Sequence, residues 1–146
     1  MKKKSLEISI YIDGAARGNP GPAGAGIILK DTKKTVREIH KYLGEATNNV
    51  AEYSAAILGL EEAIALGYKN AVLHMDSELV SQQLKGEYRV RDENMKVLFE
   101  KAIRLINSFD SVKIVKIDRE NNKEADKLAN KAINLSGLGA ASKIII

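Results

Sequence analysis

The chain has 146 residues, 45% of them hydrophobic, which is the size of one ordinary domain with enough apolar side chains for a closed core. It contains no cysteine, so disulfide bonds and thiolate metal sites are excluded, and any metal ion must be held by oxygen or imidazole ligands. The net charge of +4 is compatible with a polyanionic partner but is too small to indicate one by itself.

The start of the chain does not have the pattern of a signal peptide. Three lysines are followed by apolar residues that Glu7 and Ser9 interrupt, and no small-residue cleavage site follows. No apolar stretch approaches the ~20 residues that span a bilayer. We therefore expect a cytoplasmic protein that has no membrane partner.

Alternating apolar and polar side chains predict three strands in the first third of the chain. Residues 6–12 have the period of a half-buried strand, which we expect to end just before Asp13. The glycine-rich residues 14–26 predict a turn into a second strand at residues 25–30, and residues 36–43 predict a third. Together these strands suggest an antiparallel meander.

Helical periodicity begins after the third strand. Apolar side chains recur every three or four positions over residues 49–66, and Gly67 is a stop signal. The remaining expected elements are a strand at 71–76, helices at 77–85 and 92–109, a strand at 111–117 and a helix at 122–135. This order, βββαβααβα, predicts an α/β fold with one mixed five-stranded sheet, helices on both faces and a single domain over residues 1–146.

Two common binding motifs are excluded. The glycines of residues 18–26 are not in GxGxxG order, and no Gly-Lys-Ser or Gly-Lys-Thr follows them. The segment that begins at Asp118 starts like a calcium loop. However, Lys123 stands where that loop needs glycine, and Ala129 stands where it needs the bidentate glutamate.

Four acidic residues lie at the ends of predicted strands or near the starts of predicted helices: Asp13, Glu52, Asp76 and Asp126. If the first and fourth strands are parallel neighbours, their carboxyl ends bring Asp13 and Asp76 together. Helices packed over that edge would add the other two. Such close like charges raise one another's pKa values, so the arrangement is favourable mainly when divalent cations compensate it.

Each of these residues also has an ordinary structural explanation. Asp13 precedes Gly14 in a common turn pair, and Asp76 is in position to cap the helix that follows it. Glu52 and Asp126 lie near helix starts, where the helix dipole favours acidic side chains. Spacing alone therefore leaves both interpretations open.

Four blocks of the sequence resemble ribonuclease HI, in the same order and over nearly the whole chain. They are YIDGAARGNPGPAG (residues 11–24), TNNVAE (47–52), MDSELV (75–80) and NKEADKLA (122–129). In that family the Asp, Glu, Asp and Asp of these blocks are the metal-binding carboxylates, which by resemblance fall on Asp13, Glu52, Asp76 and Asp126. The resemblance implies a ribonuclease H-like fold and an endoribonuclease that hydrolyses the RNA strand of RNA/DNA hybrids.

The resemblance also implies a mechanism with two magnesium ions, for which manganese can substitute. The ions lie about 4 Å apart; one activates the attacking water and the other stabilises the departing 3′ oxygen. The carboxylates then serve chiefly as ligands, and no protein nucleophile is required. The expected products carry 5′-phosphate and 3′-hydroxyl ends.

By the same resemblance, Asn19, Asn48 and Asn49 line the hybrid-binding surface, and Thr47 holds a DNA phosphate. Short neutral side chains suit the reading of 2′-hydroxyls through the wide minor groove of an A-like duplex. Turn or cap chemistry is the alternative role for Asn19 and Asn48. An RNA/DNA hybrid is the expected partner of a monomer, and the sequence indicates no protein partner.

Two segments depart from the family pattern. Many members carry a basic helical protrusion between the second and third helices, whereas residues 86–92 are too few for one, so we expect lower affinity for the hybrid. Many members also have a histidine on a loop before the last helix. Here the shorter residues 118–121 carry Arg119, which we place among the catalytic residues as a ligand of the scissile phosphate or its product. A solvated loop arginine is the alternative.

The chain ends with Ile144, Ile145 and Ile146, which we expect to form an edge strand or a cover that packs back on the domain. A partner-binding tail and a disordered end are the alternatives.

Two other functions remain open for a protein of this pattern. One is a nuclease with the same metal site and a broader or different substrate, such as double-stranded RNA or DNA. The other is a non-catalytic nucleic-acid-binding module of the same fold, against which the presence of all four carboxylates argues.

Overall fold

The structure is a computed structural model that describes the backbone of residues 7–145 and the side chains of residues 7–136. Its elements are β1 (Glu7–Ala16), β2 (Gly21–Asp31), β3 (Lys34–Ala46), α1 (Asn48–Ala65), β4 (Asn70–Met75), α2 (Glu78–Leu84), α3 (Glu93–Asn107), β5 (Ser111–Lys116), the short 3-10 helix η1 (Arg119–Asn121) and α4 (Lys123–Ile145). Apart from η1, their order is the βββαβααβα order that the sequence predicts.

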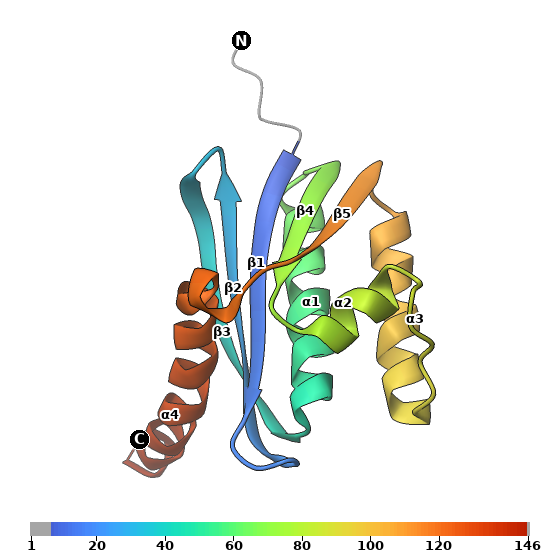
Figure 1. Cartoon of the computed structure of the whole chain (residues 1–146). Coiled ribbons are helices and arrows are strands. Elements are labelled where there is room, and N and C mark those ends of the chain that lie inside the picture. Colours follow the sequence, from blue (N-terminus) through green and yellow to red (C-terminus); the bar gives the residue numbers. More distant parts are fainter. Residues whose placement is uncertain (1–6, 146) are drawn as a thin grey trace.

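The five strands form one mixed sheet in the order β3-β2-β1-β4-β5 (Figure 1). The neighbours β1 and β2 are antiparallel, as are β2 and β3, whereas β4 runs parallel to both β1 and β5. The condition on which the meeting of Asp13 and Asp76 depended, a parallel pairing of the first and fourth strands, is therefore met. It ends at the pair Tyr11 and His74, so the residues that follow in each strand emerge at the same edge.

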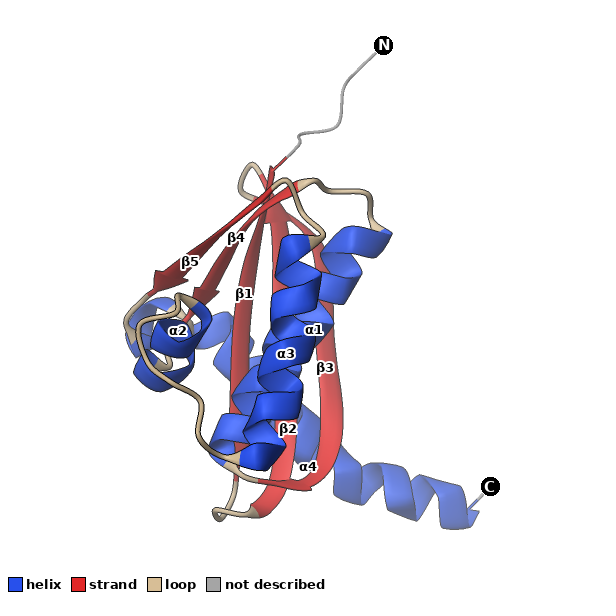
Figure 2. Ribbon diagram, turned by 90° about the vertical axis from the view of Figure 1, so that its right-hand side faces the viewer, coloured by secondary structure: helices blue, strands red, loops and turns tan. Residues whose placement is uncertain are grey.

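Helices cover both faces of the sheet: α1 and α3 lie on one face and α4 on the opposite one (Figure 2). The main core lies between the sheet and α1. Ile8, Ile10 and Ile12 of β1 are fully buried there together with Tyr53 and Leu60 of α1. This is the face that the period-2 pattern of β1 and the helical period of α1 predict. None of the helices between residues 7 and 145 is long and apolar enough to cross a membrane.

The glycine-rich segment is mostly strand, so the turn predicted over residues 14–26 is wrong. Strand β1 continues to Ala16 and β2 starts at Gly21, which leaves only four residues for the turn. Asp13 is accordingly not the last residue of its strand but pairs with Gly26 of β2. It does lie beyond the last pair that β1 makes with β4, so the predicted approach to Asp76 is preserved.

These glycines serve close packing between helices and strands. A Cβ atom on Gly14 would overlap the backbone of Ala51 in α1. On the other face, a Cβ atom on Gly26 would lie 2.6 Å from the backbone nitrogen of Ala129 in α4. Glycine inside a strand marks such an approach as readily as it marks a turn, which explains the error.

The end of the chain also differs from the prediction. Helix α4 continues past residue 135 to Ile145, through Gly137 and Gly139 as well as alanines at 140 and 141. Ile144 and Ile145 are therefore helical, and the predicted edge strand is wrong for both. Ile146 and the side chains of residues 137–145 lie outside the described part of the structure, so the predicted packing of the tail falls there too.

Candidate active site

Three carboxylates from three elements meet where the pairing of β1 and β4 ends. Asp13 comes from β1, Glu52 from the second turn of α1, and Asp76 directly follows β4. One oxygen of each carboxylate lies within 4.8 Å of the others. Asp13 and Glu52 are each only 6% exposed, and Asp76 is half-buried. Hard divalent cations prefer such a set of oxygen ligands.

Asp126 completes the predicted set from the first turns of α4, at the margin of the cluster. It lines the same cavity of ≈ 450 Å³ but does not belong to the group of oxygens within 4.8 Å of one another. Its carboxyl group is close enough to Asp13 to contribute to the raised pKa of that residue. The structure therefore brings all four predicted carboxylates to one cavity, three of them with oxygens within 4.8 Å of one another.

Burial and mutual repulsion make the cluster costly to ionise. Loss of hydration is the largest cause of the raised pKa of Asp13, and contact with Glu52 and the charge of Asp76 raise it further. Loss of hydration also raises the pKa of Glu52, although contact with Asp13 and the Gly14 N–H partly offset it. Glu52 Oε2 is buried and has no hydrogen-bond donor among the described residues. A bound cation would supply the missing positive charge.

Local hydrogen bonds fix Glu52 in this cluster. Thr47 caps α1, because its Oγ1 accepts a hydrogen bond of 3.2 Å from the backbone nitrogen of Val50. The helix then turns Glu52 toward β1, where the backbone nitrogen of Gly14 donates a hydrogen bond of 2.7 Å to Glu52 Oε1. One oxygen of Glu52 is thereby bound to the protein, and the other stays unpaired.

A second set of hydrogen bonds holds Asp126. Asn130, one turn further along α4, donates from Nδ2 to the carbonyl oxygen of Asp126 at 3.0 Å and to its Oδ1 at 3.3 Å. Arg17, in the turn after β1, donates to Asn130 Oδ1 at 3.3 Å and to its carbonyl oxygen at 3.4 Å. The sequence analysis missed both residues. The four-residue spacing of Asp126 and Asn130 was the signal that could have indicated Asn130.

Arg119 lies in η1 and lines the cavity of the four carboxylates. Its side chain is exposed, and its positive charge lowers the pKa of Glu52. The arginine thus lies in η1 at the wall of the acidic cavity and makes no ion pair with any described carboxylate within 4.0 Å. Its binding of a phosphate stays a prediction.

Two of the four predicted substrate-binding residues line the same cavity, and the other two lie next to Asn48, Thr47 in the chain and Asn19 through a hydrogen bond. Asn48 and Asn49 are the two that line the cavity. Asn19 Oδ1 accepts a hydrogen bond of 3.0 Å from the backbone nitrogen of Asn48, and Asn48 Oδ1 accepts one of 3.1 Å from that of Ala16. The side chains of Asn19 and Asn48 therefore each hold part of the backbone in place. Both amides nevertheless keep their NH₂ groups without a partner among the described residues.

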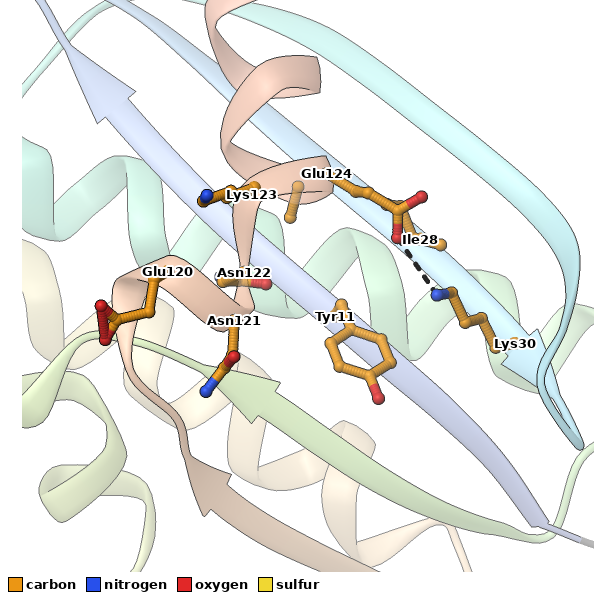
Figure 3. Close-up of a pocket in the computed structure, with 9 residues that line it drawn as sticks. Tyr11, Ile28, Lys30, Glu120, Asn121, Asn122, Lys123 and Glu124 are labelled. Atoms are coloured by element: carbon orange, nitrogen blue, oxygen red, sulfur yellow. Dashed lines mark hydrogen bonds and ion pairs between the residues drawn. The ribbon is translucent and has the colours of Figure 1, made fainter.

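A separate cavity of ≈ 290 Å³ lies between β1, β2 and the start of α4 (Figure 3). There the rings of Tyr11 and His74 stack with their centroids 4.1 Å apart. The ammonium group of Lys30 lies 5.4 Å from the centroid of the Tyr11 ring and 3.1 Å from Glu124 Oε1. None of the predicted site residues lines this cavity. The candidate active site is therefore the acidic cavity.

Comparison with known proteins identifies the fold. A family model described as reverse transcriptase-like matches residues 11–132. The N-terminal RNase H domain of rv2228c from Mycobacterium tuberculosis has a TM-score of 0.85 and 38% identity, covering 88% of this chain and 99% of that chain. LC11-RNase H1, solved in complex with an RNA/DNA hybrid, has a TM-score of 0.84 and 41% identity, covering 88% and 98%. The fold and the acidic cavity thus define a protein of the ribonuclease H class.

Two relatives of known sequence indicate the family within this class. Ribonuclease HI of Halobacterium salinarum is 39% identical over 128 residues, which are 87% of this chain and 64% of that protein. The bifunctional protein Rv2228c of Mycobacterium tuberculosis is 37% identical over 139 residues, 94% of this chain and 38% of that protein. The chain belongs to the ribonuclease HI family. It spans less than two thirds of the length of either relative.

Proposed function

We propose that this protein is a metal-dependent endoribonuclease that hydrolyses the RNA strand of RNA/DNA hybrids and leaves 5′-phosphate and 3′-hydroxyl ends. The observation that carries the proposal is the cluster of Asp13, Glu52 and Asp76, whose oxygens lie within 4.8 Å of one another. Asn48 and Asn49 line the same cavity. The LC11 relative was solved with an RNA/DNA hybrid, which supports the substrate class.

The donor set fits magnesium, with manganese as a substitute. It consists only of oxygen ligands, and Glu52 Oε2 is a buried, unpaired acceptor that a cation would satisfy. In the proposal Asp13, Glu52, Asp76 and Asp126 hold two ions. When bound, such ions activate water and stabilise a departing oxygen by Lewis acidity.

Arg119 has a role in the proposal that the carboxylates cannot fill. Arginine stays protonated at any working pH, so it cannot act as a general base. Its planar group can instead bind a phosphate through two parallel hydrogen bonds. In the proposal Arg119 binds the scissile phosphate or the 5′-phosphate of the product, which its exposure and its position at the cavity wall support.

In the proposal, the polar residues near the start of α1 recognise the hybrid. Asn19 and Asn48 use their carbonyl oxygens within the protein, so their NH₂ groups are available as donors to 2′-hydroxyls and base edges in the minor groove. Asn49 lies beside them on the cavity wall. Thr47 Oγ1 accepts the capping hydrogen bond, and its hydroxyl hydrogen can still be donated to a DNA phosphate.

A panel of defined duplexes tests this function. The panel contains an RNA/DNA hybrid, a double-stranded RNA and a double-stranded DNA of the same sequence. Each duplex is incubated separately with the wild-type protein and with Glu52→Gln. We expect cleavage of the hybrid RNA by the wild-type protein alone. Faster cleavage of double-stranded RNA or DNA would establish the rival substrate, and binding without cleavage would establish the non-catalytic module. A monomeric state, a single domain and a cytoplasmic location stay predictions.

A further inference from the structure

Asn122 is a buried asparagine directly before α4 that lines the cavity of Figure 3 and contacts the candidate active site through Asp76. Its side chain is only 2% exposed. Nδ2 donates a hydrogen bond of 2.8 Å to the carbonyl oxygen of Ile12 and one of 3.0 Å to Asp76 Oδ2. Ile12 lies one residue beyond the last β1–β4 pair, so this amide takes the place of a strand partner at the point where the two strands separate.

The hydrogen bonds of Asn122 are not those of a helix cap, although the residue directly precedes α4. At the starts of α1, α2 and α3, the side chains of Thr47, Ser77 and Asp92 each accept a hydrogen bond from the backbone nitrogen three residues later. Asn122 Oδ1 is buried and has no partner within the described chain. Asn122 Oδ1, the atom that would accept a capping hydrogen bond, is therefore unused, and Nδ2 donates to Asp76.

We infer that Asn122 is a positioning residue that fixes the carboxylate of Asp76 for cation binding. The bond from Nδ2 occupies Asp76 Oδ2, and Asp76 Oδ1 has no hydrogen-bond partner among the residues described. One oxygen is thus held by the protein while the other stays available to a cation. This inference rests on the proposed function, because it assumes that the acidic cluster holds metal ions.

The same residue also connects a second carboxylate to the cluster. The backbone nitrogen of Asp126 donates a hydrogen bond of 3.1 Å to the carbonyl oxygen of Asn122. The side chain of Asn122 therefore holds Asp76, and its backbone anchors the first turn of α4, which carries Asp126. Hydrogen-bond partners of metal-binding carboxylates orient the ligands, and their loss typically weakens metal affinity by about 10- to 100-fold.

The experiment measures Mn²⁺ binding to the substrate-free protein by isothermal titration calorimetry. Asn122→Ala is compared with the wild type and with the matched control Asn121→Ala, at a temperature where circular dichroism shows all three folded. Asn121 is the exposed neighbour, and its side chain makes no hydrogen bond with the described residues. We expect the Kd for Mn²⁺ to rise at least about tenfold in Asn122→Ala. It should stay unchanged in Asn121→Ala.

Two further readouts separate positioning from mere stability. The Mg²⁺ concentration for half-maximal cleavage of the hybrid should rise in Asn122→Ala, whereas metal-free binding of the hybrid should equal that of the wild type. If the alanine variant does not fold, Asn122→Ser, which keeps a small donor, is measured in its place. A folded variant that binds Mn²⁺ as tightly as Asn121→Ala would overturn the role of Asn122 alone. A wild-type protein that binds no Mn²⁺ would overturn the metal site and the proposed function with it.

Discussion

The backbone nitrogen of Gly14 donates a hydrogen bond of 2.7 Å to Glu52 Oε1, which fixes a carboxylate of α1 against the strand that carries Asp13. This contact requires α1 to lie very close to β1. Only a residue without Cβ allows that approach, since a Cβ atom on Gly14 would overlap the backbone of Ala51. The geometry of the acidic cluster therefore depends on a glycine that contributes only its backbone to the site.

Gly14→Ala should consequently damage both the stability and the activity of the protein. Forcing extra atoms into a packed site costs about 1–3 kcal/mol or more, so the free energy of unfolding by urea should fall by at least that amount. Cleavage should fall further, because α1 and Glu52 must move away from Asp13. Gly44→Asn is the control: Gly44 has φ +77°, which asparagine tolerates, and nothing lies within 4 Å of an added Cβ. Equal unfolding curves for both variants would contradict the close packing.

Asp13→Asn should raise the melting temperature of the metal-free protein. The pKa of Asp13 is raised in the folded state, mainly by loss of hydration, so ionisation favours the unfolded chain. This penalty is absent below the unfolded pKa of about 4 and grows as the pH rises toward the folded value. The gain in melting temperature should therefore be larger at pH 8 than at pH 5. A gain of the same size at both pH values would show that Asp13 ionises as freely in the folded protein as in the unfolded chain.

Arg119→Ala should reduce turnover of the hybrid by about tenfold or more, which corresponds to about 1.4 kcal/mol of lost transition-state stabilisation. Arg119→Lys should retain only part of the wild-type turnover, because the ammonium group of lysine lacks the forked geometry of the guanidinium group. Arg104→Ala removes the same charge from an exposed position on α3 and should leave turnover unchanged. If Arg119→Ala cleaves the hybrid as fast as Arg104→Ala in both single-turnover and steady-state assays, Arg119 is a solvated surface residue without a role in the reaction.

Asn48→Ala should lower the specificity of the protein for a hybrid over other duplexes. It removes the NH₂ group at the cavity rim and also the acceptor for the backbone nitrogen of Ala16. Each lost hydrogen bond is worth about 1 kcal/mol, so we expect a several-fold loss on the hybrid. The loss on double-stranded RNA should be smaller. A uniform loss on every substrate would indicate that Asn48 only ties the turn after β1 to α1.

The sequence alone predicts the order of the elements and the meeting of the carboxylates. Alternation along residues 6–12 identifies β1, and the run before Asp76 identifies β4. Once these two strands are taken as parallel, their ends must bring Asp13 and Asp76 together. The strands themselves follow from periodicity, which is a local property of a sequence, whereas their parallel pairing joins distant segments and was an assumption.

Features that depend on contacts between distant residues escaped the sequence analysis. Gly26 was assigned to a turn because the sequence does not show that α4 packs directly on it. Asn122 was included in the block at residues 122–129 but was given no role, since nothing near it in the sequence indicates that its amide reaches Ile12, 110 residues away. Arg17 was missed for the same reason, because its partner Asn130 is 113 residues away.

The central claim, that the acidic cluster is a metal-dependent nuclease site, is tested most directly by following one labelled RNA strand in an RNA/DNA hybrid. Wild-type protein and Asp76→Asn, matched by circular dichroism, are compared in Mg²⁺ and in excess chelator. We predict cleavage to 5′-phosphate and 3′-hydroxyl products by the wild type in Mg²⁺, and none in chelator or by Asp76→Asn. Cleavage that persists in chelator, or at the wild-type rate in Asp76→Asn, would contradict this account.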